Sequence, residues 1–349
     1  MTTLATPPRD FAVPTARIAV GPPEHRGVAR DRVNLLVARA GRIAHTRFDA
    51  LPDLLAPGDL VVVNDSVTRP AAIDGTVAGR TVVVHLSVAR DDGTWTIELR
   101  RPDGSGPVLG SVDDDTVHLT GGGHARLVGP TDGPDTRLRR AALTVPDGGV
   151  ARSYMAVHGR PITYGPRARR WPLAAYQTVF ARLYGSAEMP SAGRPFSHRV
   201  VTGLVSRGIT VAPITLHAGV SSPERHEPPA AEWYEVSPAT AALVHHTRRR
   251  GGRVVAVGTT VTRALETVAS ADGTVTPGTG WTDLVLGPQR PARVVDALLT
   301  GWHEADASHL LLLDAVAGAE FVDRAYAVAL DGPYLWHEFG DLCLLLPDR

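Results

Sequence analysis

The hydrophobic pattern changes along the chain. From about residue 173 onward, segments with the 3.6-residue period of amphipathic helices alternate with short apolar runs typical of strands. We expect helices at 199–206, 238–250, 259–269 and 320–330, strands at 209–216, 254–257 and 342–346, and a further strand and helix within 294–313. This alternation predicts a mostly parallel sheet flanked by helices.

The N-terminal part of the chain contributes to the same sheet. Residues 33–48 alternate as a hairpin does, and the apolar run 60–63 predicts a buried strand. Between about 70 and 150, short β-type runs at 81–88, 94–99 and 117–119 are separated by Gly, Pro and Asp turns. The sequence therefore predicts an α/β main domain formed by residues 1–70 and 151–349, with an all-β barrel-like domain inserted at 71–150.

Composition excludes several enzyme classes. The 36 basic residues are all arginines, so a Walker phosphate loop, a pyridoxal Schiff base and a Ser-x-x-Lys nucleophile are excluded. Formal net charge is zero, so any contact with RNA must come from a local basic patch. With the single cysteine Cys343 and no pattern of a signal peptide or membrane span, we expect a cytoplasmic protein with no membrane partner.

A polar cluster follows the predicted strand at 60–63. Asn64, Asp65 and Ser66 stand where the carboxyl end of that strand would be, and Arg69 comes shortly after. Ligands of open α/β sheets bind beyond the carboxyl ends of strands, which favours a small-molecule site here. An Asx turn that merely ends the strand is the alternative.

A second candidate is the start of the helix expected at 259–269. The turn Gly258-Thr259-Thr260 leads into that helix, which carries Arg263 and Glu266 one turn apart. Free backbone N–H groups and the positive end of the helix dipole suit a carboxylate or phosphate, and Arg263 would add to this. The alternative is a threonine cap followed by an exposed Arg263–Glu266 pair.

Histidines and arginines supply the remaining candidates. His217, His226 and His303 could handle protons near neutral pH, and their spacing matches no recognised metal motif, so we expect no metal. The stretch 152–170 holds five arginines, interleaved aromatic residues and no acidic residue. It is typical of an RNA-facing loop, although a solvated connector would have the same composition.

Several blocks, taken in order, resemble one known family from about Leu35 to Leu346. The chain is similar, block by block, to the S-adenosylmethionine:tRNA ribosyltransferase-isomerase family of queuosine biosynthesis. The blocks are Leu51-Pro52-Asp53-Leu54-Leu55 leading into 58–65, Tyr176-Gln177-Thr178-Val179-Phe180, Pro190-Ser191-Ala192-Gly193, Thr215-Leu216-His217-Ala218-Gly219, Glu232-Trp233-Tyr234-Glu235-Val236, 251–266, Gly280-Trp281-Thr282-Asp283 and 294–300.

The resemblance implies a fold, a reaction and partners. The family's fold is an α/β domain that carries an inserted β-barrel domain. Its reaction transfers and isomerises the ribosyl part of S-adenosylmethionine onto 7-aminomethyl-7-deazaguanine in tRNA, giving epoxyqueuosine-tRNA and releasing adenine and methionine. S-adenosylmethionine is then a co-substrate, no metal or redox cofactor is expected, and the tRNA anticodon stem-loop is the expected partner. We expect a monomer.

Residue roles follow from these motifs together. We expect Asp65, His217 and His303 to handle protons. We expect Arg167, Arg169 and Arg170 to contact RNA. The expected substrate-binding residues are Asn64, Arg69, Pro190, Ser191, Gly193, Tyr234, Glu235, Gly258, Thr259, Thr260, Arg263, Asp283 and Asp296.

Three blocks depart from the family pattern. Arg194-Pro195 stands where the family has Leu-His, His226-Glu227-Pro228-Pro229 lacks one histidine, and Gly301-Trp302-His303-Glu304-Ala305 keeps its histidine but changes the neighbours. Two alternatives therefore stay open at this point. One is a divergent paralogue that uses S-adenosylmethionine on another acceptor, and the other is a non-catalytic nucleoside- or RNA-binding protein.

Overall fold

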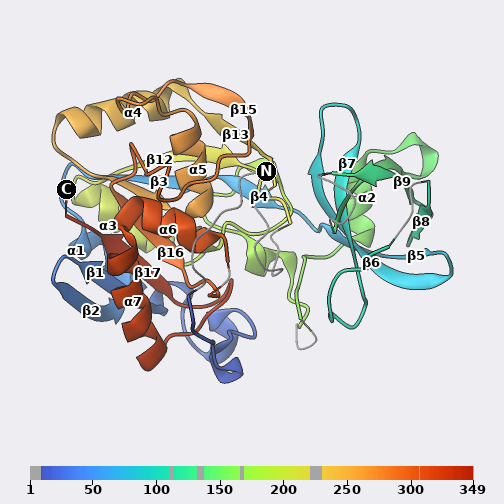
Figure 1. Ribbon diagram of the computed structural model, residues 1–349, viewed down its shortest axis with the longest axis horizontal. Helices are drawn as coiled ribbons and strands as arrows, with labels where there is room; N and C mark the ends of the chain where they lie inside the picture. Colours follow the sequence, from blue (N-terminus) through green and yellow to red (C-terminus); the bar gives the residue numbers. More distant parts are fainter. Residues whose placement is uncertain are drawn as a thin grey trace.

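The chain folds into two lobes, seen side by side in Figure 1. The structure, a computed structural model, describes residues 9–110, 114–131, 137–165, 169–220, 230–305 and 307–348. One lobe is built on a nine-stranded sheet and the other is a closed barrel. The sequence prediction of an α/β domain with an additional β-barrel is confirmed.

The main sheet is mixed. In spatial order its strands are β15 (Gly278–Thr282), β13 (Glu232–Val236), β12 (Thr210–Leu216), β3 (Leu60–Asn64), β14 (Val254–Val257), β16 (Ala297–Gly301), β17 (Leu342–Leu346), β1 (Asn34–Arg39) and β2 (Arg42–Arg47). The four strands from β12 to β16 are parallel, as are β17 and β1, whereas the pairings of β16 with β17 and of the outer strands are antiparallel.

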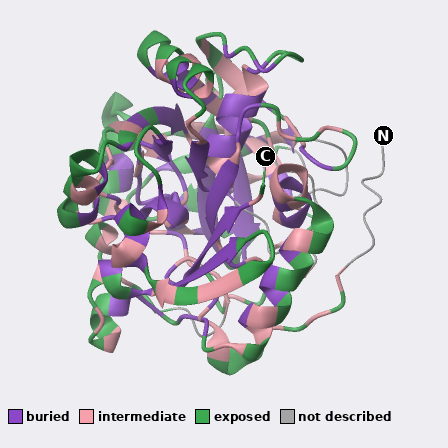
Figure 2. Cartoon of the chain, turned by 90° about the vertical axis from the view of Figure 1, so that its left-hand side faces the viewer, coloured by how far each residue is buried: buried purple, intermediate pink, exposed green. Residues whose placement is uncertain are grey.

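Helices cover both faces of this sheet, which explains why central strands such as β3 are apolar at nearly every position. Even-numbered β3 residues Leu60 and Val62 pack beneath α4 (Pro238–Arg249), α5 (Thr259–Thr267), α6 (His309–Ala317) and α7 (Ala319–Asp331). Odd-numbered Val61 and Val63 pack towards α1 (Leu51–Leu54) and α3 (His198–Ser206). Figure 2 shows the buried sheet between helices that are partly exposed.

The barrel closes in the order β10 (Leu138–Thr144), β7 (Trp95–Arg100), β6 (Arg80–Ala89), β5 (Ala72–Val77), β8 (Thr116–Leu119) and β9 (His124–Pro130). Helix α2 (Ala151–His158) packs Tyr154 and Met155 into its core. A small parallel sheet of β4 (Ser66–Thr68) and β11 (Leu183–Ser186) lies where the chain passes between the lobes.

The structure gives the bounds of the elements that the sequence predicted. The strands expected at 254–257 and 342–346 are β14 and β17 with the predicted bounds, and the pair expected within 294–313 is β16 followed by α6. The arginine-rich stretch at 152–170, interpreted as a loop, contains most of α2. Short 3-10 helices complete the chain: η1 (Thr15–Arg17), η2 (Pro23–Arg26), η3 (Arg30–Arg32), η4 (Phe48–Ala50), η5 (Pro146–Gly148), η6 (Leu173–Tyr176) and η7 (Ser191–Gly193).

Candidate active site

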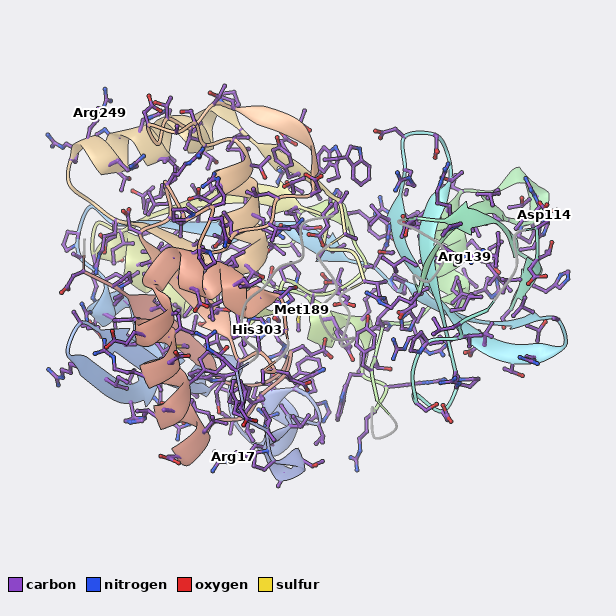
Figure 3. The ribbon with its side chains drawn as sticks, in the orientation of Figure 1. Arg17, Asp114, Arg139, Met189, Arg249 and His303 are labelled. Carbon is purple, nitrogen blue, oxygen red and sulfur yellow. The ribbon has the colours of Figure 1, made fainter. Side chains whose placement is uncertain are left out.

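The topology brings several loops to one edge of the sheet. Because β12, β3, β14 and β16 are parallel, their carboxyl ends meet at that edge, and the antiparallel β17 brings its preceding loop there as well. A cavity of about 340 Å³ lies at this edge, and Leu138 and Tyr164 line it from the barrel side. Figure 3 labels two residues that line the cavity, Met189 and His303, on the side of the main domain towards the barrel.

The start of α5 forms part of the cavity wall, through Gly258, Thr259 and Thr260. Gly258 has a φ of 91°, a left-handed conformation that favours glycine, and an added Cβ would come within 3.3 Å of Ala192. A glycine has no side chain to cap the helix, so the N–H groups of the first turn need another acceptor. The helix start expected to bind an anion thus opens onto the cavity.

Arg263 also lines the cavity but is tightly held. Its guanidinium donates to the backbone oxygens of Leu284 at 3.2 Å, Thr282 at 3.0 Å and Ala230 at 3.3 Å, and it forms an ion pair with Glu232. Four acceptors occupy four of its five N–H groups. Arg263 therefore stabilises the wall, and one of its N–H groups has no acceptor among the described residues.

The alternative of an exposed Arg263–Glu266 pair is wrong. Both side chains are buried, with 6% and 1% of their surface exposed. The Glu266 carboxylate accepts hydrogen bonds from the backbone N–H groups of Arg293, Val294 and Val295 at 2.8–3.1 Å. The two residues therefore hold different segments: Arg263 holds 282–284, and Glu266 holds 293–295.

His303 shares the cavity wall with a second histidine, His309. The two rings are parallel within 2°, with centroids 4.6 Å apart. His303 Nε2 lies 3.1 Å from Thr300 Oγ1, and its backbone N–H donates to the Tyr326 hydroxyl. Burial, with a smaller contribution from the neighbouring ring, places the pKa of His303 well below its usual value, and burial beside Arg263 lowers the pKa of His309 to about 4. Both imidazoles are neutral at pH 7.

Asp65 and His217 lie beside the cavity, in a hydrogen-bonded group that we call the β3 network. The Asp65 carboxylate accepts from Thr215 Oγ1 at 2.6 Å and from Arg182 at 2.8 Å. His217 Nδ1 lies 2.8 Å from Ser66 Oγ, and its ring stacks on Trp233. The β3 network comprises Asn64, Asp65, Ser66, Arg182, Ser186, Thr215 and His217.

The β3 network reaches the cavity through Asn64, whose Nδ2 donates to Thr260 Oγ1 at 3.4 Å and to the Leu216 oxygen at 2.8 Å. Burial lowers the pKa of His217 to about 4, and the positive charge of Arg69 adds to this effect. His217 is therefore neutral at pH 7, as a proton acceptor must be, but it does not line the cavity.

The other predicted site residues are distributed over the fold. Pro190 and Ser191 line the cavity, whereas Gly193 packs near Thr178 at the end of η7. Arg69 is buried, donates to the Leu86 oxygen and lies over the Trp95 ring, which ties the barrel to the main domain.

Four further candidates lie outside the cavity wall. Tyr234 is in the main core, and Glu235 is its half-buried neighbour on β13. Asp283 is exposed. Asp296 accepts a hydrogen bond from the Val254 backbone N–H at 2.8 Å, which fixes the turn before β16. Substrate binding by these four residues stays a prediction.

Sequence reasoning missed part of the cavity wall. Glu188, Trp302, Trp336, Glu338 and His309 line it, and none of them has a role in the motifs recognised in the sequence. The indole Nε1 atoms of Trp302 and Trp336 are buried and have no hydrogen-bond partner within the described residues. For Trp302, its position next to His303 in the sequence could have indicated that it lines the cavity. The other four residues come from segments that are distant in the sequence.

The departures from the family pattern have partly structural roles. Arg194 is 3% exposed, and its guanidinium donates to both oxygens of Glu24, at 2.9 and 3.1 Å, and to the Ala175 oxygen. Pro195 is buried beside it. Trp302 and Glu304 line the cavity. The His226–Pro229 departure lies outside the described residues.

The predicted RNA-binding stretch is divided. Arg152 lies over the Tyr184 ring and Arg160 forms an ion pair with Asp74, so both have partners in the protein. Arg169 and Arg170 are exposed, and Arg167 lies outside the described residues. Among the described arginines of the stretch, Arg169, Arg170 and the ring-stacked Arg152 are exposed and accessible to phosphate.

Metal-binding clusters and membrane-spanning helices are both absent from the described part of the chain. Among these residues, no three His, Cys, Asp or Glu side chains gather where they could hold a metal ion, and the expectation that no cofactor is needed stays a prediction. No helix in the described ranges is long and apolar enough to cross a membrane.

Comparison with known proteins supplies the family. A family model described as "Queuosine biosynthesis protein" matches residues 8–345. Proteins named S-adenosylmethionine:tRNA ribosyltransferase-isomerase from Moorella thermoacetica and Anaeromyxobacter dehalogenans are 35% and 37% identical, each over 97% of this chain and 98% of their own.

A solved structure agrees with these relatives. The crystal structure of the S-adenosylmethionine tRNA ribosyltransferase from Thermotoga maritima matches with a TM-score of 0.53 and 28% identity, over 96% of this chain and 98% of its own. Matches of this extent include both the sheet and the barrel. The chain belongs to the queuosine biosynthesis family of S-adenosylmethionine:tRNA ribosyltransferase-isomerases.

Proposed function

We propose that this enzyme transfers and isomerises the ribosyl moiety of S-adenosylmethionine onto 7-aminomethyl-7-deazaguanine in tRNA, forming epoxyqueuosine-tRNA with release of adenine and methionine. The observation that carries the proposal is one cavity that combines an uncapped helix start, a neutral histidine and an aromatic wall. It occurs in a chain that is similar along nearly its whole length to proteins named for this activity.

Each part of the cavity suits one part of S-adenosylmethionine. The start of α5 offers N–H donors and a positive dipole end to the methionine carboxylate. Trp302 and Trp336 provide apolar rings, and their unpartnered indole N–H groups suit a planar nitrogen base such as adenine. These assignments use atoms that have no partner among the described residues.

His303 is the proposed base. The positive sulfonium acidifies the ribose carbon beside it, so the reaction begins with loss of a proton from that carbon. A neutral imidazole in a buried cavity can accept this proton, and burial keeps His303 neutral at pH 7 by lowering its pKa. Asp65 and His217 remain proposed proton-handling residues through the link of Asn64 to Thr260.

The acceptor would approach from the side of the exposed Arg169 and Arg170, because a molecule of zero net charge needs a local basic surface to hold tRNA. Guanidinium groups are suited to phosphate, and the neighbouring Trp171 adds an aromatic ring. The proposed partner is the anticodon stem-loop, and we propose that the enzyme acts as a monomer in the cytoplasm.

The direct test supplies purified protein with S-adenosylmethionine and tRNA that contains 7-aminomethyl-7-deazaguanine. Release of adenine together with the nucleoside mass of epoxyqueuosine would support the proposal. Adenine without that mass would identify a paralogue with another acceptor. Tight binding of S-adenosylmethionine with neither product would identify a non-catalytic binding protein.

A further inference from the structure

One carboxylate in the cavity wall has no ion-pair partner among the described residues. Glu338 lies on the loop before β17, lines the cavity, and makes no hydrogen bond or ion pair within the described residues. The arginine whose charge acts on Glu338 is Arg194, and its guanidinium is already bound to both oxygens of Glu24. A half-buried carboxylate without a cation is costly, so the empty protein favours the protonated form of Glu338.

A second polar group beside Glu338 also lacks a partner. Tyr176 of η6 is 2% exposed, and its hydroxyl is buried without a hydrogen bond to any described residue. It lies close enough to Glu338 that burial and this carboxylate together raise the pKa of the phenol. Tyr176 does not line the cavity, so Glu338 is the one of these two unpartnered groups that is placed to meet a ligand there.

The loop holds Glu338 in place. His337 has a φ of 84°, and its oxygen accepts from the Gly340 N–H at 2.9 Å. Asp341 binds the Leu335 N–H at 2.7 Å and the Asn34 side chain at 3.0 Å, which anchors the other end of the loop to β1. Glu338 is therefore presented by a fixed turn, as a preorganised binding group must be.

We propose that Glu338 is the counter-charge for an organic cation in this cavity. This inference rests on the proposed function, in which the ligand is S-adenosylmethionine. That molecule carries a permanent sulfonium and, at neutral pH, an ammonium on its methionine part. Either cation would pair with Glu338 while the α5 start, at another part of the same wall, binds the carboxylate.

The charged surroundings of Glu338 predict how binding depends on protons. Burial, and then the like charge of Glu188, raise the pKa of Glu338 to about 8, and Arg194 opposes this. The other titratable neighbours are Tyr176, and His337 on the same loop. In the empty cavity at pH 7 the Glu338 carboxyl is thus mostly protonated, and a bound cation would displace its proton.

Isothermal titration of the intact protein with S-adenosylmethionine, in buffers of different ionisation enthalpy at pH 7, measures this proton. For the wild type we expect release of about one proton per ligand. For Glu338→Gln we expect no such release and about tenfold or more weaker binding. Glu320→Gln, at an exposed position on α7, is the matched control and should behave as the wild type.

Two related compounds identify the cation. S-adenosylhomocysteine keeps the ammonium but has a neutral sulfur, and 5′-methylthioadenosine has neither charge. If Glu338→Gln weakens both S-adenosylmethionine and S-adenosylhomocysteine, Glu338 binds the ammonium. If it weakens S-adenosylmethionine alone, Glu338 binds the sulfonium. An equal loss for the neutral 5′-methylthioadenosine would overturn the proposal, because a counter-charge cannot act on an uncharged ligand.

Failure of this inference is distinguishable from failure of the proposed function. Unchanged affinity and unchanged proton release in Glu338→Gln would overturn the role of Glu338 and leave the proposed function intact. Absence of binding heat in both proteins, with no shift in their melting temperatures, would overturn the proposed function and the assignment that rests on it. Glu338→Asp is the second variant, and it should retain proton release if the charge is what matters.

Discussion

The β3 network and the cavity lie next to each other, yet their polar side chains differ in whether they have hydrogen-bond partners in the protein. In the β3 network the polar side chains of Asn64, Asp65 and Ser66 all have partners in the protein. In the cavity wall the indoles of Trp302 and Trp336 have none within the described residues. Saturated polar groups stabilise a fold, whereas unsatisfied ones beside a cavity indicate where a ligand binds.

This difference changes the weight given to the predicted residues. Asp65 and His217 follow strands at the carboxyl edge, as sequence reasoning required, but their hydrogen bonds connect β3, β11 and β12. His303 follows β16 at the same edge and lines the cavity. We therefore expect the variants of the two regions to separate into effects on turnover and effects on stability.

The largest effect should come from His303→Gln. Loss of the proposed base should lower the rate of adenine release about 100-fold or more, equivalent to about 2.7 kcal/mol. Single-turnover release of adenine measures it. His217→Gln is the matched comparison and should lower the rate less. The reverse order would move the proton transfer into the β3 network.

The next effect concerns stability. Asp65→Asn removes the charge that Arg182 and Thr215 bind, and should lower the free energy of unfolding by about 2 kcal/mol. Urea denaturation measures it, with the exposed Asp283→Asn as a control near zero. If Asp65→Asn unfolds like the wild type but no longer releases adenine, Asp65 is catalytic rather than structural.

The sequence could predict those site features whose residues are adjacent in the chain, but not those brought together from distant segments. Hydrophobic periodicity located β14 and β17 because short apolar runs between turns leave few alternatives. Gly258 and its threonines were found because a strand end and a helix start adjoin in sequence. Glu338 and His309 were not found, because they reach the cavity through the antiparallel pairing of β17 with β16 and the packing of α6.

Arg263 is a residue that the sequence did identify, but whose hydrogen-bond partners the sequence could not show. Its residue type and its place on α5 predicted an anion-holding role, and it does line the cavity. Its acceptors are Glu232 on β13 and backbone oxygens at 230, 282 and 284. No local pattern indicates four acceptors from separate segments, so the sequence could not show that most of its donors were already used.

A smaller effect should appear in the pH dependence of stability. The folded-state pKa values of His217 and His309 are lowered to about 4, below the usual 6.5. Between these values the two histidines bind more protons in the unfolded chain, so their contribution to stability should be constant above pH 6.5 and fall as the pH drops towards 4. Denaturation across this range should give a shallower fall for His309→Gln.

His246→Gln, at an exposed position of α4, is the control for this pH series and should follow the wild type. His217→Gln should flatten the curve as His309→Gln does, because each of these histidines is neutral in the folded protein. If the His309 variant kept the full acid sensitivity, its imidazole would have to be charged in the folded protein, and the parallel pair with His303 would not be a neutral one.

The smallest expected effect on the enzyme itself comes from a double variant that tests whether tRNA binds outside both the β3 network and the cavity. Arg169 and Arg170 are exposed and contribute to neither the β3 network nor the cavity wall, so replacing both by alanine should leave stability and S-adenosylmethionine affinity unchanged. Affinity for the anticodon stem-loop should fall, and the slope of log affinity against log salt should decrease by about 1 for each phosphate that the variant no longer binds. Filter binding over a salt series measures both quantities.

Arg42→Ala, exposed on the edge strand β2, is the matched control for the loss of positive charge. It should alter neither the affinity for the stem-loop nor the salt slope, because β2 is an edge strand of the main sheet and is not part of the 152–170 stretch. An equal loss in this control would mean that tRNA responds to overall charge. An unchanged slope in the double variant would place the phosphate-binding residues elsewhere on the molecule.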